Sequence, residues 1–353
     1  MICCDGTANE FAADRTNVVK LCSVLRNGPG QVVYYQPGLG TMEPPGALSG
    51  VSGAVTKLLG RAVGYGLEAD VRNAYVFLME TYEDGDRVFL FGFSRGAYTV
   101  RAVASLVKMY GLLPRGNHAL VPYAIRLLKA VGKFRERGVR DAFHLADEFK
   151  ATFAARNAPV HFVGVWDTVS SIGWIGNPLR LPYTANNPDI AIGRHAVAID
   201  ERRAFYRTNL WRASGLRGPS GPRDLVQVWF PGVHSDVGGG YPDAEGRLSD
   251  MALEWMVDEG TCAGLDVDPD KVAALVGPGG ARPGAPMHRS LKGLWWLAEI
   301  VPKRRAGGTG WRLNLGRGRQ LPKGSLVHWS AFERPGYAAR LPDHVIRYPG
   351  RSA

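Results

Sequence analysis

Short apolar runs alternate along the chain with segments in which apolar residues recur at helical spacing. The runs predict buried strands at residues 1–4, 32–35, 88–91, 160–166 and 225–230. The helical spacing predicts helices at residues 16–25, 67–82, 97–107 and 248–258. Strands that alternate with helices are joined by right-handed crossovers, which favour parallel pairing. The pattern therefore predicts an α/β fold with a doubly wound, mostly parallel sheet.

Two stretches between the predicted strands do not continue this alternation. Residues 112–158 have a helical and basic pattern, and residues 170–223 form a mixed insertion rich in Pro, Asn and Arg. We expect residues 112–158 to lie outside the sheet, and both insertions are candidates for a cap. We expect residues 1–262 to form one catalytic α/β domain, and residues 263–353 to be a Gly/Pro-rich C-terminal extension packed on that domain.

Charge is distributed unevenly along the 353 residues. Residues 281–353 hold 14 of the 43 Lys and Arg but 3 of the 32 Asp and Glu, a surplus of 11 that equals the net charge of +11. Residues 1–280 are therefore balanced, with 29 residues of each sign. The basic extension thus has a surface chemistry different from that of the rest of the chain.

The remaining composition excludes several classes of protein. No stretch reaches the ~18–20 apolar residues of a membrane span, and residues 1–7 lack the basic and apolar regions of a signal peptide. The four cysteines, at positions 3, 4, 22 and 262, lack metal-ligand spacing, so we expect reduced thiols. We therefore expect a cytoplasmic protein, at most peripheral to a membrane, that uses no metal or other cofactor.

The sharpest local signal is Gly92-Phe93-Ser94-Arg95-Gly96, a G-x-S-x-G sequence. It lies between the strand predicted at residues 88–91 and the helix predicted at residues 97–107. This setting is typical of a nucleophile elbow, a strained strand-to-helix turn in α/β-hydrolase-like sheets that exposes a serine. Glycine on both sides makes room for the turn because it has no Cβ. We expect Ser94 to be a nucleophile.

A serine hydroxyl is a poor nucleophile until a base takes its proton, and the base needs a carboxylate to fix its tautomer. In doubly wound hydrolases the three residues follow in the chain order Ser, acid, His, each just after a strand. Asp167 follows the strand predicted at 160–166, and His234 follows the one at 225–230. Among the eight histidines, His234 alone combines a preceding strand, a turn and a glycine-rich continuation. The sequence therefore predicts Ser94, Asp167 and His234 as a catalytic triad.

Other carboxylates compete with Asp167 for the acid role. Asp236 lies two residues after His234, where it would either orient the imidazole or cap the turn. Asp5 ends the first predicted strand, and Asp200 stands beside two arginines that suit an ion pair. Asp5 and Asp236 together could hold a hard cation, but two scattered carboxylates are too few to predict a metal site.

The oxyanion formed during acyl transfer needs backbone donors. The N–H of Arg95 stands at the start of the helix after Ser94, where amides point toward a developing negative charge. The turn that ends the first strand offers a second donor, from Gly6 or Thr7.

These motifs together resemble the DUF2235 family, which includes the catalytic domain of Tle1-like type VI secretion phospholipase effectors. The matching segments are Asp5-Gly6-Thr7, Thr16-Asn17-Val18, Gly38-Leu39-Gly40-Thr41, Gly85-Asp86-Arg87, Gly92-Phe93-Ser94-Arg95-Gly96, Trp166-Asp167-Thr168-Val169, Asp200-Glu201-Arg202-Arg203 and the run from Trp229 to Tyr241. The resemblance covers about residues 1–262 and implies a Ser-Asp-His hydrolase of the α/β-hydrolase type. The large membrane-facing insertions of the secreted effectors are absent, so the chain resembles a compact, stand-alone member.

The expected function is hydrolysis of a carboxylic ester, such as a lipid or phospholipid acyl ester, through an acyl-enzyme. The alternative is a non-catalytic module for a membrane surface or a partner, built on the same fold. The extension supports membrane contact, because cations accompany an apolar group at residues 294–297. These cations are Lys303, Arg304, Arg305, Arg312, Arg317 and Arg319. The basic extension could also contact nucleic acid or be a solvated surface. Nucleic acid is the least expected of these, because it does not fit a lipid-like ester substrate. The sequence predicts no oligomeric state.

Overall fold

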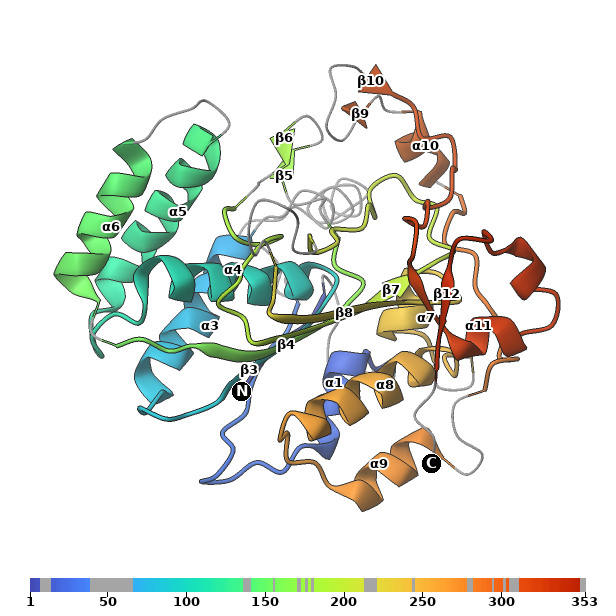
Figure 1. Ribbon diagram of the computed structural model, residues 1–353, viewed down its shortest axis with the longest axis horizontal. Helices are drawn as coiled ribbons and strands as arrows, with labels where there is room; N and C mark the ends of the chain where they lie inside the picture. The colour runs from blue at the N-terminus through green and yellow to red at the C-terminus, as the bar shows by residue number, and fades with distance from the viewer. Residues whose placement is uncertain are drawn as a thin grey trace, which may run out of the picture.

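The computed structural model describes residues 1–6, 14–38, 66–135, 141–154, 156–169, 173–174, 177–178, 181–212, 221–242, 245–277, 282–293, 295–300, 303–304 and 311–349. Within these ranges, an eight-stranded sheet with helices on both faces organises the molecule (Figure 1). Two short antiparallel pairs lie outside this sheet. They are β5 (Gly173–Trp174) with β6 (Asn177–Pro178), and β9 (Lys303–Arg304) with β10 (Trp311–Arg312).

All neighbouring strands of the main sheet are parallel. In spatial order they are β2 (Tyr34–Gln36), β1 (Ile2–Cys4), β3 (Val88–Phe93), β4 (Val160–Trp166), β7 (Ile192–Ala198), β8 (Asp224–Phe230), β11 (Leu326–His328) and β12 (Ile346–Tyr348). The order reverses at β1, so the sheet is doubly wound, and ligands of such sheets gather beyond the carboxyl ends of the strands. The fold class predicted from the sequence is confirmed.

Helices cover both faces of the sheet. One face carries α3 (Leu67–Thr81), α4 (Arg95–Tyr110), α5 (Val121–Arg135) and α6 (Asp141–Phe153), and the other carries α1 (Asn17–Val24), α8 (Ser249–Cys262) and α9 (Pro269–Val276). The shorter helices are α7 (His234–Gly238), α10 (Trp295–Glu299), α11 (Trp329–Glu333) and the 3-10 turns η1 (His118–Leu120) and η2 (Ala338–Arg340). In the described ranges, no helix has both the length and the apolar character that crossing a membrane requires.

Strand β3 shows the sequence pattern of a strand that is covered by helices on both faces of the sheet. All six of its residues are buried. Val88 and Leu90 pack into the core beneath α3 and α4, whereas Phe89, Phe91 and Phe93 pack into the core beneath α1 and α8. Successive side chains of a strand point to opposite faces, so a strand covered on both sides is apolar at every position.

The interpretation of residues 170–223 as an insertion is wrong for β7, which belongs to the main sheet. This strand pairs with β4 on one side and with β8 on the other. Its sequence lacks a clear apolar run because it contains Arg194, whose charge is balanced by Asp224 at 2.7 Å and Glu259 at 2.5 Å. A buried polar residue is tolerated in a central strand when its bonds are satisfied.

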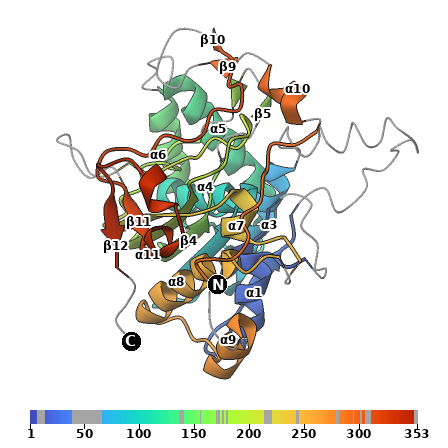
Figure 2. The same ribbon diagram turned by 90° about the vertical axis from the view of Figure 1, so that its right-hand side faces the viewer.

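The C-terminal extension contributes strands to the same sheet. Strand β11 pairs with β8, and β12 pairs with β11 (Figure 2). In the other insertion, residues 112–158, α5 and α6 pack on α4 and lie outside the sheet as expected. The end of the chain therefore returns to the strand that leads into His234.

Gly96 makes the tightest contact between α4 and the end of β1. A Cβ at this position would overlap the carbonyl oxygen of Cys4 and lie 2.5 Å from that of Asp5. We expect Gly96→Ala to lower the free energy of unfolding by at least about 2 kcal/mol, because only a backbone shift relieves the overlap. Urea unfolding followed by circular dichroism measures the loss. Gly28→Ala, where no atom lies within 4 Å of the added carbon, is the control; equal stability of the two variants would refute this prediction.

Candidate active site

The three residues predicted as a triad all lie at the carboxyl-terminal edge of the sheet. Ser94 follows β3, Asp167 follows β4, and His234 begins α7 just after β8. The parallel arrangement brings these strand ends to one edge although the residues are far apart in sequence.

Ser94 occupies a strained turn between β3 and α4. Its backbone angles are φ 57° and ψ −116°, and its N–H donates to the carbonyl of Trp166 at 3.0 Å. A positive φ at a residue with a Cβ is held only by the surrounding structure, and such strain is common at catalytic nucleophiles. Gly92 makes the turn possible, since a Cβ there would lie 2.5 Å from the carbonyl oxygen of Gly96. The geometry agrees with the nucleophile elbow expected from the sequence.

Asp167 and His234 are joined directly. His234 Nδ1 lies 2.5 Å from Asp167 Oδ2, and both side chains are buried. The other carboxylate oxygen, Oδ1, accepts the N–H of Ala198 at 3.0 Å. The imidazole stacks on Phe93 at a centroid distance of 4.6 Å and meets the edge of Tyr206 at 4.7 Å. With Nδ1–H donated to the carboxylate, Nε2 is the nitrogen left to accept a proton.

The electrostatics of this pair favour a neutral imidazole beside an ionised carboxylate. Burial lowers the pKa of His234, although the bond to Asp167 acts in the opposite direction. Burial alone would raise the pKa of Asp167, but the charges and hydrogen bonds of Arg319 and His234 hold it well below its ordinary value. His234 is therefore in the form required of a general base at neutral pH.

Arg319 lies at this site, although the sequence pattern placed it elsewhere. It was grouped with the cations of a membrane-facing extension, yet its side chain is only 7% exposed and lies against Asp167. Nη1 donates to Oδ1 at 2.5 Å and Nη2 to Oδ2 at 3.0 Å. The same nitrogens bond the carbonyls of Ala198 at 2.8 Å and Tyr206 at 2.6 Å. Nothing in the sequence distinguishes this arginine from its neighbours, because its partner lies 152 residues earlier.

The alternative acids have other partners. Asp236 bonds His288 Nδ1 at 2.6 Å, and its Oδ2 accepts the N–H of Val233 at 3.0 Å, so it caps the start of α7. Asp5 accepts the hydroxyls of Thr16 at 2.6 Å and Tyr35 at 3.1 Å. Asp200 binds the N–H of Gly232 and the hydroxyl of Tyr337, at 2.7 and 2.5 Å.

Of the three predicted oxyanion donors, the structure describes Arg95 and Gly6. Arg95 is the first residue of α4, directly after Ser94. The N–H of Gly6 donates to Asp5 Oδ1 at 2.6 Å and is already used in this conformation. Thr7 lies outside the described residues.

Among the residues that the structure describes, no three histidine, cysteine or acidic side chains gather in a group that could hold a metal ion.

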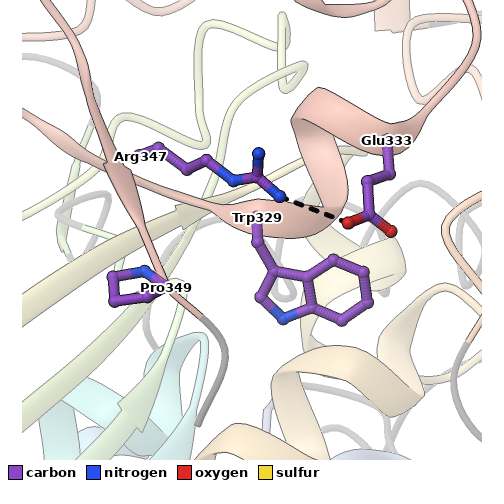
Figure 3. A pocket seen from close by; sticks show the side chains of 4 residues that line it. All are labelled: Trp329, Glu333, Arg347 and Pro349. Atoms are coloured by element: carbon purple, nitrogen blue, oxygen red, sulfur yellow. Dashed lines mark hydrogen bonds and ion pairs between the residues drawn. The ribbon is translucent and has the colours of Figure 1, made fainter. Parts of the chain in front are cut away.

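A separate surface hollow lies at the β12 edge of the sheet. It is lined by Trp329, Glu333, Arg347 and Pro349, between α11 and the edge strand β12 (Figure 3). Two of these residues, Arg347 and Glu333, form an ion pair at 3.2 Å. Four strands, β4, β7, β8 and β11, separate β12 from β3 in the sheet, so the hollow is distinct from the site at Ser94.

Comparison with known proteins places the chain among relatives of different length. Residues 1–259 match the family described as "T6SS, Phospholipase effector Tle1-like, catalytic domain". The Saccharomyces cerevisiae protein YEL023C is 34% identical over 217 residues, which are 59% of this chain and 32% of that protein. A crystal structure of an uncharacterized Pseudomonas aeruginosa protein is 21% identical with a TM-score of 0.46, covering 77% of this chain and 47% of that one. The Tle1 effector bound to the VgrG spike from the Type 6 secretion system is 18% identical with a TM-score of 0.33, covering 68% and 50%.

The chain thus spans from about a third to a half of the length of these relatives. The family match runs from β1 into α8 and includes Ser94, Asp167 and His234, whereas Arg319 lies beyond it. Because this match covers well over half of the sequence, the chain belongs to the family of Tle1-like catalytic domains of T6SS phospholipase effectors.

Proposed function

We propose that the protein is a serine hydrolase that cleaves a carboxylic ester of a lipid. In this proposal Ser94 is the nucleophile, His234 the general base and Asp167 the residue that orients the imidazole. The observation that supports it most is the 2.5 Å bond between His234 and Asp167, at the same sheet edge as the strained Ser94 turn.

The first half of the reaction would acylate the serine. His234 Nε2 takes the hydroxyl proton as Ser94 Oγ attacks the ester carbonyl carbon. The carboxylate of Asp167 keeps Nδ1 protonated and stabilises the imidazolium that forms. The N–H of Arg95, at the positive end of α4, donates to the developing oxyanion. His234 then returns the proton to the leaving alcohol as the carbon–oxygen bond breaks.

The second half would release the acid. A water molecule loses a proton to His234 and attacks the acyl carbon, and the serine oxygen leaves with the proton from the imidazolium. Both halves need His234 to be neutral before each attack. The lowered pKa of His234 meets this requirement at neutral pH.

The surface near the site suits a lipid substrate. Trp296 and Ile300, in and just after α10, are 52% and 59% exposed, and Leu313 and Leu315 are exposed as well. The turn at Gly316 lies beside Trp296, since a Cβ there would be 3.2 Å from the indole. Exposed apolar residues on a basic segment are typical of proteins that bind an anionic lipid surface. We propose that this surface holds the protein at the lipid from which the ester is taken.

An active serine can be tested directly with a fluorophosphonate probe. We expect the wild-type protein to be labelled, and both Ser94→Ala and His234→Ala to lose labelling. We expect Ser94→Ala to lower ester turnover by about 10⁴–10⁶-fold, because the residues of a triad act as a unit.

Two substitutions away from the site serve as controls for the labelling. Ser23→Ala removes a hydroxyl that bonds the Lys20 carbonyl, and His118→Ala removes a ring that pairs with Glu80. Both should be labelled like the wild type. A folded wild type that is not labelled would reject the enzyme proposal and favour a non-catalytic membrane-surface module.

The lipid surface can be tested by sedimentation with vesicles of phosphatidylglycerol and phosphatidylcholine. We expect Trp296→Ser with Ile300→Ser to weaken vesicle binding about tenfold or more, since each exposed apolar side chain contributes on the order of 1 kcal/mol or more when buried. Hydrolysis of a water-soluble short-chain ester should change little. Ile346→Ser is the matched control, because Ile346 is 53% exposed but lies on β12 at the sheet edge. Equal loss in both variants would argue against a specific surface.

A further inference from the structure

The part of the chain beyond the family match reaches back over the proposed catalytic residues. We call the described residues between positions 282 and 319 the C-terminal strap; Figure 2 shows α10, β9 and β10 of this segment beyond the main sheet. Three of its side chains bond the loop after β7 and the helix α7. His288 binds Asp236, Ser290 Oγ donates to Glu201 at 2.9 Å, and Glu299 accepts the N–H of Ala204 at 2.6 Å.

The fourth anchor of the strap is Arg319, at its end. Its guanidinium makes a bidentate contact with Asp167, donating one hydrogen bond to each carboxylate oxygen. This geometry fixes the plane of the carboxylate, because an arginine fork and a carboxylate match each other in two bonds at once. The carboxylate plane in turn determines the direction in which Oδ2 meets His234 Nδ1.

Arg319 also changes the charge that His234 experiences. The charged groups that face the imidazole come as two ion pairs, Asp167 with Arg319 and Glu201 with Arg203 at 3.0 Å. Glu201 additionally accepts the N–H of His234 at 3.2 Å, and the Arg203 guanidinium stacks on Tyr206. On its own helix, Asp236 pairs with His288.

Both carboxylates that face the imidazole, Asp167 and Glu201, are therefore compensated by an arginine. An imidazolium there would gain little net Coulombic stabilisation, while it would lose its hydration. The pKa of His234 lies below its ordinary value chiefly because the ring is buried, and the charge of Arg203 acts in the same direction.

We propose that Arg319 is a positioning residue that fixes the Asp167 carboxylate and extends the activity of His234 as a base to lower pH, so that the C-terminal strap completes the active site. The proposal rests on the proposed hydrolase function for its catalytic meaning. Arg319 acts through Asp167 and has no assigned contact with substrate. A base works only while neutral, so its lowered pKa keeps kcat/KM high below the pH where an ordinary histidine is already protonated.

The test compares the pH dependence of kcat/KM on a soluble ester in the wild type, Arg319→Gln and Arg319→Lys. We expect Arg319→Gln to move the acid limb upward by about one pH unit, because an uncompensated Asp167 stabilises the imidazolium. Arg319→Lys keeps the cation, so its limb should stay near that of the wild type, while its rate falls on the order of tenfold from the lost fork. Lys323→Gln, an exposed cation four residues later, should match the wild type in both.

The position of the limb separates this role from a purely structural one. Partial unfolding lowers the rate at every pH but leaves the limb of the surviving enzyme in place. An acid limb of Arg319→Gln that stays in place or moves to lower pH would overturn the proposal. If Arg319→Gln yields no folded protein, a limb of Arg319→Lys displaced by a unit from that of the wild type would overturn it instead.

A ring ¹⁵N NMR titration of His234 measures the same shift without turnover. Histidine-labelled protein is compared with His234→Gln to identify the signal. A raised His234 pKa in Arg319→Gln supports the charge role even where the protein hydrolyses no ester. If Arg319→Gln raises the His234 pKa but the fluorophosphonate probe does not label the wild type, the hydrolase function alone is rejected. If the wild type is active but Arg319→Gln leaves the His234 pKa unchanged, the role of Arg319 is rejected.

Discussion

A carboxylate with no exposed surface is the constraint on which the site depends. Asp167 is fully buried at the end of β4, where an unpaired charge would cost several kcal/mol. Its charge is met from three directions: the N–H of Ala198 in the neighbouring strand, the imidazole of His234, and the guanidinium of Arg319. Three distant parts of the chain must therefore meet at one point, and the parallel sheet provides the common edge where they do.

Most of the fold could be predicted because the sheet is covered on both sides. Strands such as β3 and β4 are apolar at nearly every position, and this is the pattern that a sequence displays most clearly. Strand β7 was missed because its buried Arg194 is satisfied by acids that lie 30 and 65 residues later. The charge balance that permits the residue is a property of the folded arrangement, and the linear pattern does not contain it.

The proposed catalytic residues were found by a different kind of signal. Ser94, Asp167 and His234 each follow a recognisable strand, so their common location was a consequence of topology. The strained φ of Ser94 and the bond between His234 and Asp167 agree with that reasoning. Arg319 follows no strand and has no motif, and composition alone assigned it to the surface. Only the folded structure shows that this cation is buried on an acid.

The distance along the chain between Asp167 and Arg319 has a consequence for biosynthesis. A ribosome that adds ~5–20 residues per second exposes the aspartate roughly 8–30 s before the arginine that neutralises it, 152 residues later. During that interval the carboxylate must stay hydrated or take up a proton, so the sheet edge around it cannot close in its final form. The charge of Asp167 would thus stay uncompensated by Arg319 until position 319 has been translated. In the proposed hydrolase, this delay would leave His234 without a fully fixed acid until that position has been synthesised.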